Sequence, residues 1–447
     1  MKYTKYILLL LLTASCGSRQ SIRHRSNHEA DVRPGVPVVT SVPTPVVVEE
    51  EEEAEEDVVS ARPLVSQVHR APQGTWQATK QQALDSLCQS PIFETTQLGL
   101  YVYDLTDGEP LYAVNAAHRM RPASCQKVVT AVTALHYLKG NYQFRTDFRI
   151  TGKKSGRVLN GDLIIVGGMD PLVSPYELLQ AATAIKQKQG IDSIGGSIIY
   201  DLFMREDAPY GWCWCWDDDY GPLSALLVDG KDTFEQNWLQ ALAQAGIKHL
   251  KTGTLKAPPL KGGLTNSTSV YTIRHNIDDV LGPMMKESDN IFAECVFYQT
   301  AASTGKKGAG HKQAQQRTDE LMKRIGLEPD RYKIADGSGL SLYNYVSAEM
   351  LVAMLGYAWR TQSIREHLLP ALPIAGVDGT LQKRMVGTEA AGNVRAKTGT
   401  VTGISSLAGY LTTATNHVLA FAIINQGVGS SSIGRAFQDK VCQELCK

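Results

Sequence analysis

A run of small and branched apolar residues directly after Lys127 constrains the fold of this chain more than any other stretch. These residues recur at helical spacing and Pro122 suits a helix entry, so the pattern predicts a buried helix that begins near Ser124. The apolar positions are Val128, Val129, Ala131, Val132, Ala134, Leu135 and Leu138. Because residues three apart share a helical face, the Lys127 amine is expected beside the Ser124 hydroxyl.

The pair Ser124 and Lys127 has the chemistry of an activated nucleophile. Burial and the positive end of a helix dipole both disfavour a charged lysine, so the pKa of Lys127 is expected to fall toward the working pH. A neutral amine can then take the serine proton. A second Ser-x-x-Lys pattern, Ser303 to Lys306, lies in a stretch rich in Gly and Lys and is assigned to a surface loop.

Ser288-Asp289-Asn290 is a second candidate motif, and it precedes another segment with helical apolar spacing. A serine hydroxyl two residues before an amide can relay a proton and hold a substrate carbonyl or amide. The alternative is a helix N-cap, for which Ser and Asp are common. The motif by itself favours the N-cap.

Lys397-Thr398-Gly399-Thr400 is the third candidate motif. Two alternating segments follow it, near 405–411 and 418–425, and they are predicted to be neighbouring antiparallel strands. A lysine and threonines at a strand end make a carboxylate-binding edge, and Gly399 is expected to let a substrate backbone come close. A similar pattern at 251–254 is assigned to a turn, because it precedes the Ser288 motif and lacks the two strands.

The composition excludes several classes of function. Lys+Arg and Asp+Glu both number 45, and no basic stripe with interleaved aromatic residues appears, so a nucleic-acid partner is not expected. No HExxH and no paired CxxC occurs, so neither a metal nor another cofactor is predicted. Bridges from Cys88 to Cys442 or to Cys446 are candidates for a disulfide between terminal segments.

The N-terminal residues are typical of an export signal. Lys2 and Lys5 precede an apolar run that is too short to span a bilayer, and small residues lead to Cys16. This pattern resembles a bacterial lipoprotein signal (residues 1–16) with Cys16 as the lipidated residue; plain secretion is the alternative. Because Gly17 is not an aspartate, we expect an outer-membrane anchor facing the periplasm, with membrane contact only through the lipid.

Residues 17–74 are polar, rich in proline and then strongly acidic, so they are predicted to be a disordered tether. Folded sequence is expected from about Thr75, with a helix near 79–88, a hairpin of strands near 97–104 and 110–114, and a helix from about Ser347. The alternation of Trp212, Trp214 and Trp216 predicts that their indole rings lie on one side of a strand. That strand is either a packed corner or a lip of the substrate cleft.

The ordered triple Ser-x-x-Lys, Ser-Asp-Asn, Lys-Thr-Gly resembles the penicillin-recognising serine enzymes. The closer resemblance is to the D-alanyl-D-alanine carboxypeptidase/endopeptidase family of low-molecular-mass penicillin-binding proteins, the penicillin-binding protein 4 type of class C, peptidase family S13. Three further stretches carry it: Gly161-Asp-Leu with Gly167-Gly-Met-Asp-Pro171, Asp336-Gly-Ser-Gly-Leu-Ser341, and 376–400.

The resemblance implies an α+β penicillin-binding/serine β-lactamase-like transpeptidase fold, an antiparallel sheet flanked by helices. Ser288 lies 164 positions after Ser124, more than one helical subdomain requires, so an inserted β-rich domain is expected at 147–269. The D,D-peptidase domain is then 75–146 with 270–447. The implied substrates are D-Ala-D-Ala ends or D-Ala cross-links of peptidoglycan stem peptides, and β-lactams would acylate the enzyme.

The resemblance also implies a role for each motif residue. Ser124 is the acylated nucleophile, Lys127 its general base and Ser288 a proton relay. The expected substrate-binding residues are Asn290, Lys397, Thr398 and Thr400, with Asp217 and Asp218 as candidates for an acidic residue that the insert directs into the cleft.

The sequence departs from the family at Leu342, where some relatives have a basic residue thought to meet the free end of the stem. The alternative functions are a β-lactamase or esterase of the same fold and a non-catalytic envelope binding protein.

Overall fold

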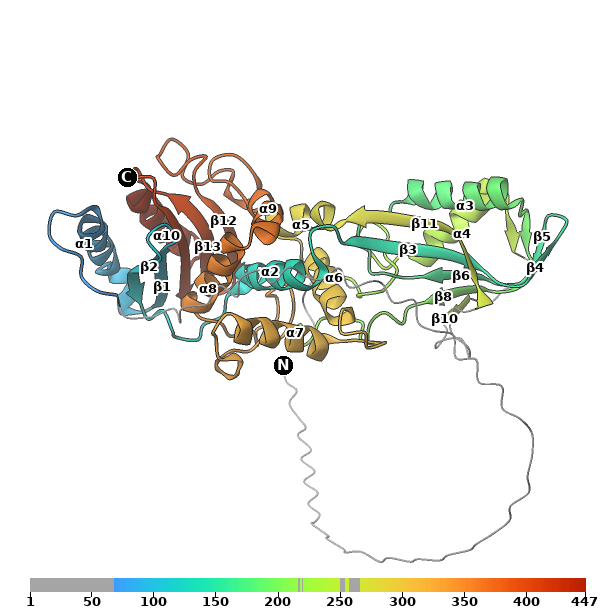
Figure 1. The fold of residues 1–447 in the computed structure, drawn as a ribbon, viewed down its shortest axis with the longest axis horizontal. Helices are drawn as coiled ribbons and strands as arrows, with labels where there is room; N and C mark the ends of the chain where they lie inside the picture. Colours follow the sequence, from blue (N-terminus) through green and yellow to red (C-terminus); the bar gives the residue numbers. More distant parts are fainter. Residues whose placement is uncertain (1–67, 216–217, 219, 250–253, 257–265) are drawn as a thin grey trace, which may run out of the picture. The chain divides into compact units, whose positions relative to one another are not determined.

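The computed structural model describes residues 68–215, 218, 220–249, 254–256 and 266–447, and of 254–256 it describes only the backbone (Figure 1). Several residues named in the sequence analysis lie outside the described residues: Cys16, the acidic run at 49–57, Trp216, Asp217 and the start of the pattern at 251–254. Within the described part of the chain, no helix is long and apolar enough to cross a membrane.

The main sheet is antiparallel and joins the two ends of the described chain. Its strand order is β12-β13-β14-β1-β2. The bounds are β1 Gln97–Asp104, β2 Glu109–Val114, β12 Arg395–Val401, β13 Ile404–Thr412 and β14 Val418–Gln426. Strand β14 pairs with both β13 and β1, with Ala422 opposite Ala408 on one side and opposite Tyr101 on the other. The predicted N-terminal hairpin and the antiparallel C-terminal strands are confirmed.

Side chains alternate between the two faces of this sheet, as period-two strands require. Phe421 and Ile423 join a core with the helices α1 (Trp76–Cys88) and α10 (Ser431–Cys446), while Ala420 and Ala422 join a larger core with α8 (Ala348–Arg360). Figure 1 shows these helices on opposite sides of the sheet. The chain therefore has the predicted architecture of an antiparallel sheet flanked by helices.

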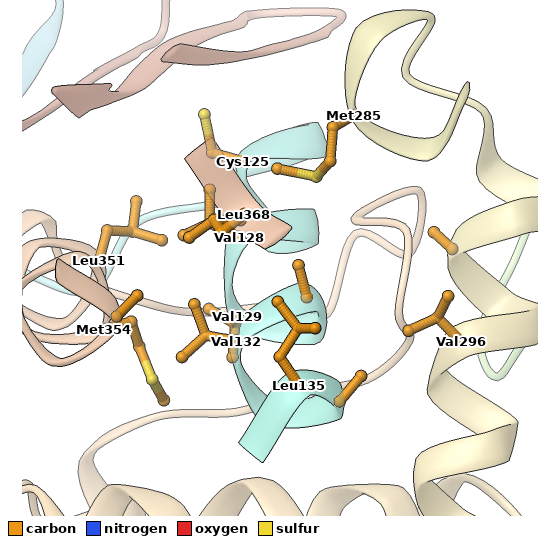
Figure 2. Packing of buried hydrophobic residues seen from close by; sticks show 14 of the residues in the cluster. Cys125, Val128, Val129, Val132, Leu135, Met285, Val296, Leu351, Met354 and Leu368 are labelled. Atoms are coloured by element: carbon orange, nitrogen blue, oxygen red, sulfur yellow. The ribbon is translucent and has the colours of Figure 1, made fainter. Parts of the chain in front are cut away.

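Helix α2 (Gln126–Leu138) lies inside the larger core, as its sequence predicts. Every residue from Gln126 to Leu135 is buried, and a helix that is apolar on all sides belongs in an interior. Figure 2 shows its valines between Leu351 and Met354 of α8 and Val296 of α6.

The other helices packed around the main sheet and α2 are α5 Ile277–Lys286, α6 Asn290–Ala302, α7 His311–Arg324 and α9 Gln362–Ala371. Short 3₁₀ turns connect these elements: η1 Pro91–Glu94, η2 Ala123–Cys125, η4 Pro329–Arg331 and η5 Gly379–Leu381.

The residues that lie between α2 and α5 in the sequence form two further sheets. The larger has the order β10-β8-β6-β3-β11 and the smaller the order β4-β5-β7-β9. Their bounds are β3 Gln143–Ile150, β4 Lys153–Ser155, β5 Val158–Asn160, β6 Leu163–Val166, β7 Ser193–Ile194, β8 Ile198–Asp201, β9 Lys248–His249, β10 Thr254–Lys256 and β11 Thr268–Asn276. The boundaries of an inserted domain at 147 and 269 stay a prediction.

The region also contains two helices that the sequence analysis did not predict, α3 (Pro175–Gln189) and α4 (Phe234–Ala245). The sequence did carry a signal for α3: Ser174 and Glu177 form a capping box, Pro175 is the first helical residue, and Gly190 ends the helix in a left-handed conformation.

Two further expectations are wrong in this structure. Of the described tryptophans in the alternating run, Trp212 lies in a turn and Trp214 in the irregular stretch after it, so neither lies in a strand. Cys213 between them has a φ of 59°, which a strand does not allow. Neither candidate disulfide forms, because Cys88, Cys442 and Cys446 are all free thiols.

Candidate active site

The candidate nucleophile stands at the entrance of α2. Ser124 lies in the 3₁₀ turn η2, directly before the helix begins at Gln126. Ala123, the residue before it, has a φ of 46°, a conformation that residues other than glycine adopt at some energetic cost. The turn places the Ser124 hydroxyl on the same side as Lys127, whose Nζ lies 3.1 Å from Ser124 Oγ.

Lys127 is completely buried, and its amine is surrounded by oxygen acceptors. Besides Ser124 Oγ, Nζ donates to Asn290 Oδ1 at 2.6 Å and to the Ser338 carbonyl at 2.8 Å. Burial lowers the pKa of Lys127 to about 8, although the carboxylates of Asp336, Glu294 and Asp289 act in the opposite direction. The lowered pKa leaves a minor neutral fraction of this amine near neutral pH, and the neutral form is a competent proton acceptor.

The Ser288 motif contains both a helix cap and site residues. Asp289 is the N-cap of α6 and accepts the backbone N–H of Phe292 at 3.0 Å. Ser288 and Asn290, on either side of the cap, contact two different lysines: Ser288 Oγ accepts from Lys397 Nζ at 2.8 Å, and Asn290 accepts from Lys127. The N-cap alternative is confirmed for Asp289, while the roles of Ser288 and Asn290 toward a substrate stay predictions. Ser288 has a φ of 63°, a second strained position at the site.

Strand β12 carries the third motif along the other side of η2. Lys397 is buried and also donates to the Thr398 carbonyl at 2.7 Å. Burial, together with the charge of Lys127, holds the pKa of Lys397 well below its ordinary value. The Thr398 hydroxyl donates to Thr380 Oγ1 at 2.8 Å, and Thr400 is exposed. The structure therefore brings all three motifs together around two buried amines.

Two glycines permit this close approach. A Cβ on Gly399 would lie 2.6 Å from the Pro122 carbonyl oxygen, so only glycine lets β12 reach η2. Gly339 has a φ of 83°, and a Cβ there would overlap the Ala123 carbonyl oxygen. The turn that carries the nucleophile fills the space that a side chain on Gly399 would take. That Gly399 also lets a substrate backbone come close stays a prediction.

A buried carboxylate organises the turn that provides the Ser338 carbonyl. Asp336 is 1 % exposed. Its oxygens accept hydrogen bonds from the backbone N–H groups of Gly339 and Ser341 and from the side chains of Asn344 (2.7 Å), Ser338 (3.2 Å) and Trp214 (2.9 Å). The sequence analysis singled out this motif without giving Asp336 a role. Its signal was an aspartate that opens a glycine-rich turn.

One residue from the region between α2 and α5 reaches this turn. Trp214 donates its indole N–H to Asp336, which connects the tryptophan-rich loop to the candidate site. Asp218, a predicted substrate-binding residue, accepts the Cys215 backbone N–H at 2.7 Å and so closes a turn in its own loop. Asp217 lies outside the described residues.

An exposed group of aromatic residues surrounds a lysine beside the same turn. Lys333 is bridged through its backbone to Tyr345, and its Nζ lies 4.9 Å from the ring centroid of Trp212 and 5.6 Å from that of Tyr343. Trp212 also stacks on His311, with centroids 5.2 Å apart. The ion pairs formed by described lysines involve Lys286 and Lys447 and do not include Lys333.

One group of described side chains has the composition of a metal site, and it belongs to another part of the main sheet. The ligand atoms of Asp104, Asp107 and His417 lie within 4.8 Å of one another. Asp104 already accepts the Thr106 backbone N–H and contacts His417 Nδ1 at 2.8 Å. Hydrogen bonds from the turn after β1 and from His417 already occupy the Asp104 carboxylate.

The model of the D-Ala-D-Ala carboxypeptidase 3 (S13) family matches residues 80–238 and 222–444, which cover most of the chain. The chain belongs to the S13 family. The resemblance that the three motifs carry is confirmed, and this S13 enzyme is a serine-type carboxypeptidase by family.

Curated relatives of this S13 enzyme include the D-alanyl-D-alanine carboxypeptidase DacB of Haemophilus influenzae, 24% identical over 76% of this chain and 87% of that protein. Carboxypeptidase DacB of Mycolicibacterium smegmatis is 28% identical over 78% and 80%. Among solved structures, penicillin binding protein 4 of Haemophilus influenzae superposes with a TM-score of 0.71 at 23% identity, covering 81% of this chain and 98% of that one. This likeness confirms the predicted penicillin-binding fold.

Proposed function

We propose that this S13 enzyme is a serine D,D-carboxypeptidase/endopeptidase that hydrolyses D-Ala-D-Ala ends or D-Ala cross-links of peptidoglycan stem peptides through an acyl-enzyme on Ser124. The observation that carries the proposal is the buried Lys127 amine, 3.1 Å from the Ser124 hydroxyl, with its pKa lowered to about 8. The relatives' names support the substrate class.

The first chemical step is acylation. Lys127 Nζ takes the Ser124 hydroxyl proton as Oγ bonds to the carbonyl carbon of the penultimate D-alanine. Backbone N–H groups of Ser124 and Thr400 are assigned to the developing oxyanion. When the C–N bond breaks, the leaving amine takes a proton through Ser288, and water then hydrolyses the ester.

Substrate binding is assigned to the residues around the two amines. Asn290 holds the acyl-side amide, and Lys397 with Thr398 and Thr400 binds the terminal carboxylate. A carboxylate beside Lys397 favours its charged form, so the buried amine gains its proton most readily when substrate is bound. Asp217 and Asp218 are assigned as candidates for the acidic residue that the insert directs into the cleft. Lys333, beside Trp212 and Tyr343, provides a cation for the stem where Leu342 provides none.

The N-terminal signal pattern and the family resemblance together support a location and a domain organisation for the enzyme. Residues 1–16 are proposed as a lipoprotein signal with lipid on Cys16, residues 17–74 as a tether, and 147–269 as an insert within the peptidase domain. The enzyme then works in the periplasm from an outer-membrane anchor. Intact mass of the membrane-extracted protein tests this: a diacylglycerol-sized increase that Cys16→Ala abolishes supports it, and secretion of an unmodified chain contradicts it.

Labelling with a fluorescent penicillin tests the catalytic assignment. We expect a stable covalent adduct on the wild-type chain and none on Ser124→Ala. Ser303→Ala is the matched control, because it removes the serine of the other Ser-x-x-Lys pattern, and it should label like the wild type. Release of D-alanine from a stem pentapeptide and cleavage of a cross-linked dimer measure the two peptidase activities.

The main alternative is a β-lactamase of the same fold. It predicts that label appears and disappears within minutes as penicillin is turned over, whereas the peptidase predicts an adduct that persists. A chain that never labels, although folded, excludes both enzymes and leaves the envelope binding protein.

A further inference from the structure

A buried glutamate that the acylation steps above do not use lies behind Lys127. Glu294 is on α6, four residues after Asn290, and it is 1 % exposed. Its Oε1 accepts two backbone N–H groups, from Gly337 at 3.0 Å and from Ser338 at 2.9 Å. Residues four apart share a helical face, so Glu294 and Asn290 project from α6 toward the same part of the core.

These contacts form a short connection to the candidate base. Glu294 fixes the backbone at Ser338, and the carbonyl of that residue accepts the Lys127 amine at 2.8 Å. Asn290 Oδ1 accepts the same amine at 2.6 Å. Helix α6 therefore sets two of the three acceptors that Lys127 contacts, one directly through Asn290 and one through Glu294.

The other oxygen of this carboxyl is unusual. Oε2 is buried and has no hydrogen-bond partner among the described residues. An ionised carboxylate left in this condition is costly, whereas a protonated one carries its hydrogen on Oε2 and keeps Oε1 as the acceptor. Burial raises the pKa of Glu294 to about 8, with Asp336 acting in the same direction and Lys127 against it.

We propose that Glu294 is a positioning residue for Lys127: its carboxyl clamps the backbone at 337–338 from α6 and so holds the Ser338 carbonyl where it orients the lysine amine toward Ser124. The charged groups that act on it are Asp336 from the glycine-rich turn and Lys127 from α2. The inference rests on the proposed Ser124 acylation.

The test compares Glu294→Gln with Glu294→Leu by the second-order rate of fluorescent-penicillin acylation from pH 6 to pH 9.5. Glutamine keeps the acceptor oxygen, so its maximal rate should stay within about threefold of the wild type. Leucine removes the acceptor, and its maximal rate should fall at least tenfold. Below the raised pKa of Glu294 both variants exchange one neutral side chain for another, so the midpoint of the rise in rate with pH should stay near that of the wild type in each.

Glu349 provides the matched control, because it is another buried glutamate, 7 % exposed, on α8. Glu349→Gln and Glu349→Leu should leave the maximal rate and the midpoint unchanged, and thermal melts confirm that each variant is folded. A folded Glu294→Leu that acylates at the wild-type rate overturns the proposal. Equal losses in Glu294→Gln and Glu294→Leu also overturn it, since the acceptor oxygen is then not what matters. Loss of labelling in the wild type itself would instead reject the proposed function.

Discussion

The Lys127 amine lies 2.6 Å from the amide oxygen of Asn290, although 163 residues separate the two along the chain. An amide oxygen accepts from either a neutral or a charged amine, so this contact orients Lys127 without fixing its charge. The burial of the amine then decides the charge, because no solvent reaches it to stabilise the ammonium form.

The first prediction concerns the pH dependence of acylation. The reactive form of Lys127 is the neutral amine, so the fraction able to accept the Ser124 proton rises as pH increases through its lowered pKa of about 8. The acylation rate by fluorescent penicillin should therefore rise about tenfold per pH unit below pH 8 and level off above it. A rate that falls with rising pH between 6 and 9 contradicts the assignment of Lys127 as the base.

Lys127→Arg is the companion variant, because a guanidinium keeps its charge throughout this range. Its acylation rate should be lower by about 10²- to 10⁴-fold, with the rise near pH 8 absent. Lys312→Arg, a change of an α7 side chain not involved in the site, should leave the rate unchanged.

The second prediction concerns the hydrogen bond between Trp214 and Asp336. Trp214→Phe keeps an aromatic ring and removes the indole donor, so Asp336 loses one of its five hydrogen bonds. We expect a loss of about 1 kcal/mol in the free energy of unfolding and an acylation rate lower by a few fold. Thermal melts and penicillin labelling measure the two effects. Trp212→Phe is the control, and an equal loss of rate there would contradict a specific role for the bond.

The local elements were predictable where one stretch of sequence decides them. The alternation at 97–104 predicted β1 with its observed bounds, and the apolar spacing behind Lys127 predicted a buried helix with Ser124 at its start. In these cases the periodicity is contained in a few neighbouring residues. The meeting of Ser124, Ser288 and Lys397 was instead implied by the family resemblance that the ordered motifs carry.

The supporting residues could not be predicted in the same way. Trp214 and Asp336 are 122 positions apart, and Glu294 acts on the backbone of Ser338, so neither relationship leaves a local pattern. The alternating tryptophans favoured a strand, but the positive φ of Cys213 breaks the strand conformation. Periodicity and propensity cannot predict contacts that form only when distant segments of the chain pack together.

The third prediction concerns Lys333. If its ammonium meets an acidic group of the stem peptide, Lys333→Met should lower kcat/KM for a stem pentapeptide about tenfold, mainly through KM, because a charged hydrogen bond is lost. Acylation by a small penicillin, which lacks the stem, should change by less than twofold. Lys323→Met on α7 is the control, and equal losses with both substrates would contradict a role in stem recognition.

The last prediction concerns His275, which bridges two carboxylates at the end of β11. Its Nδ1 lies 2.8 Å from Asp170 Oδ2 and its Nε2 lies 3.1 Å from Glu177 Oε1. The hydrogen bond to Asp170 raises the pKa of His275 against the opposing effect of burial, and the charges of Asp170, Glu177 and Asp279 act in the same direction as the bond.

Because the folded pKa is raised, the stabilisation is fully present below the unfolded value of about 6.5 and is lost as pH rises through the folded value. His275→Gln should therefore lower the melting temperature more at pH 5.5 than at pH 8.5, with a difference of roughly 2 to 4 °C for each kcal/mol lost. His367→Gln is the matched control, since His367 pairs with the more exposed Asp278 and an exposed pair contributes little. An equal effect of His275→Gln at both pH values would show that the bridge stabilises the fold through packing and not through charge.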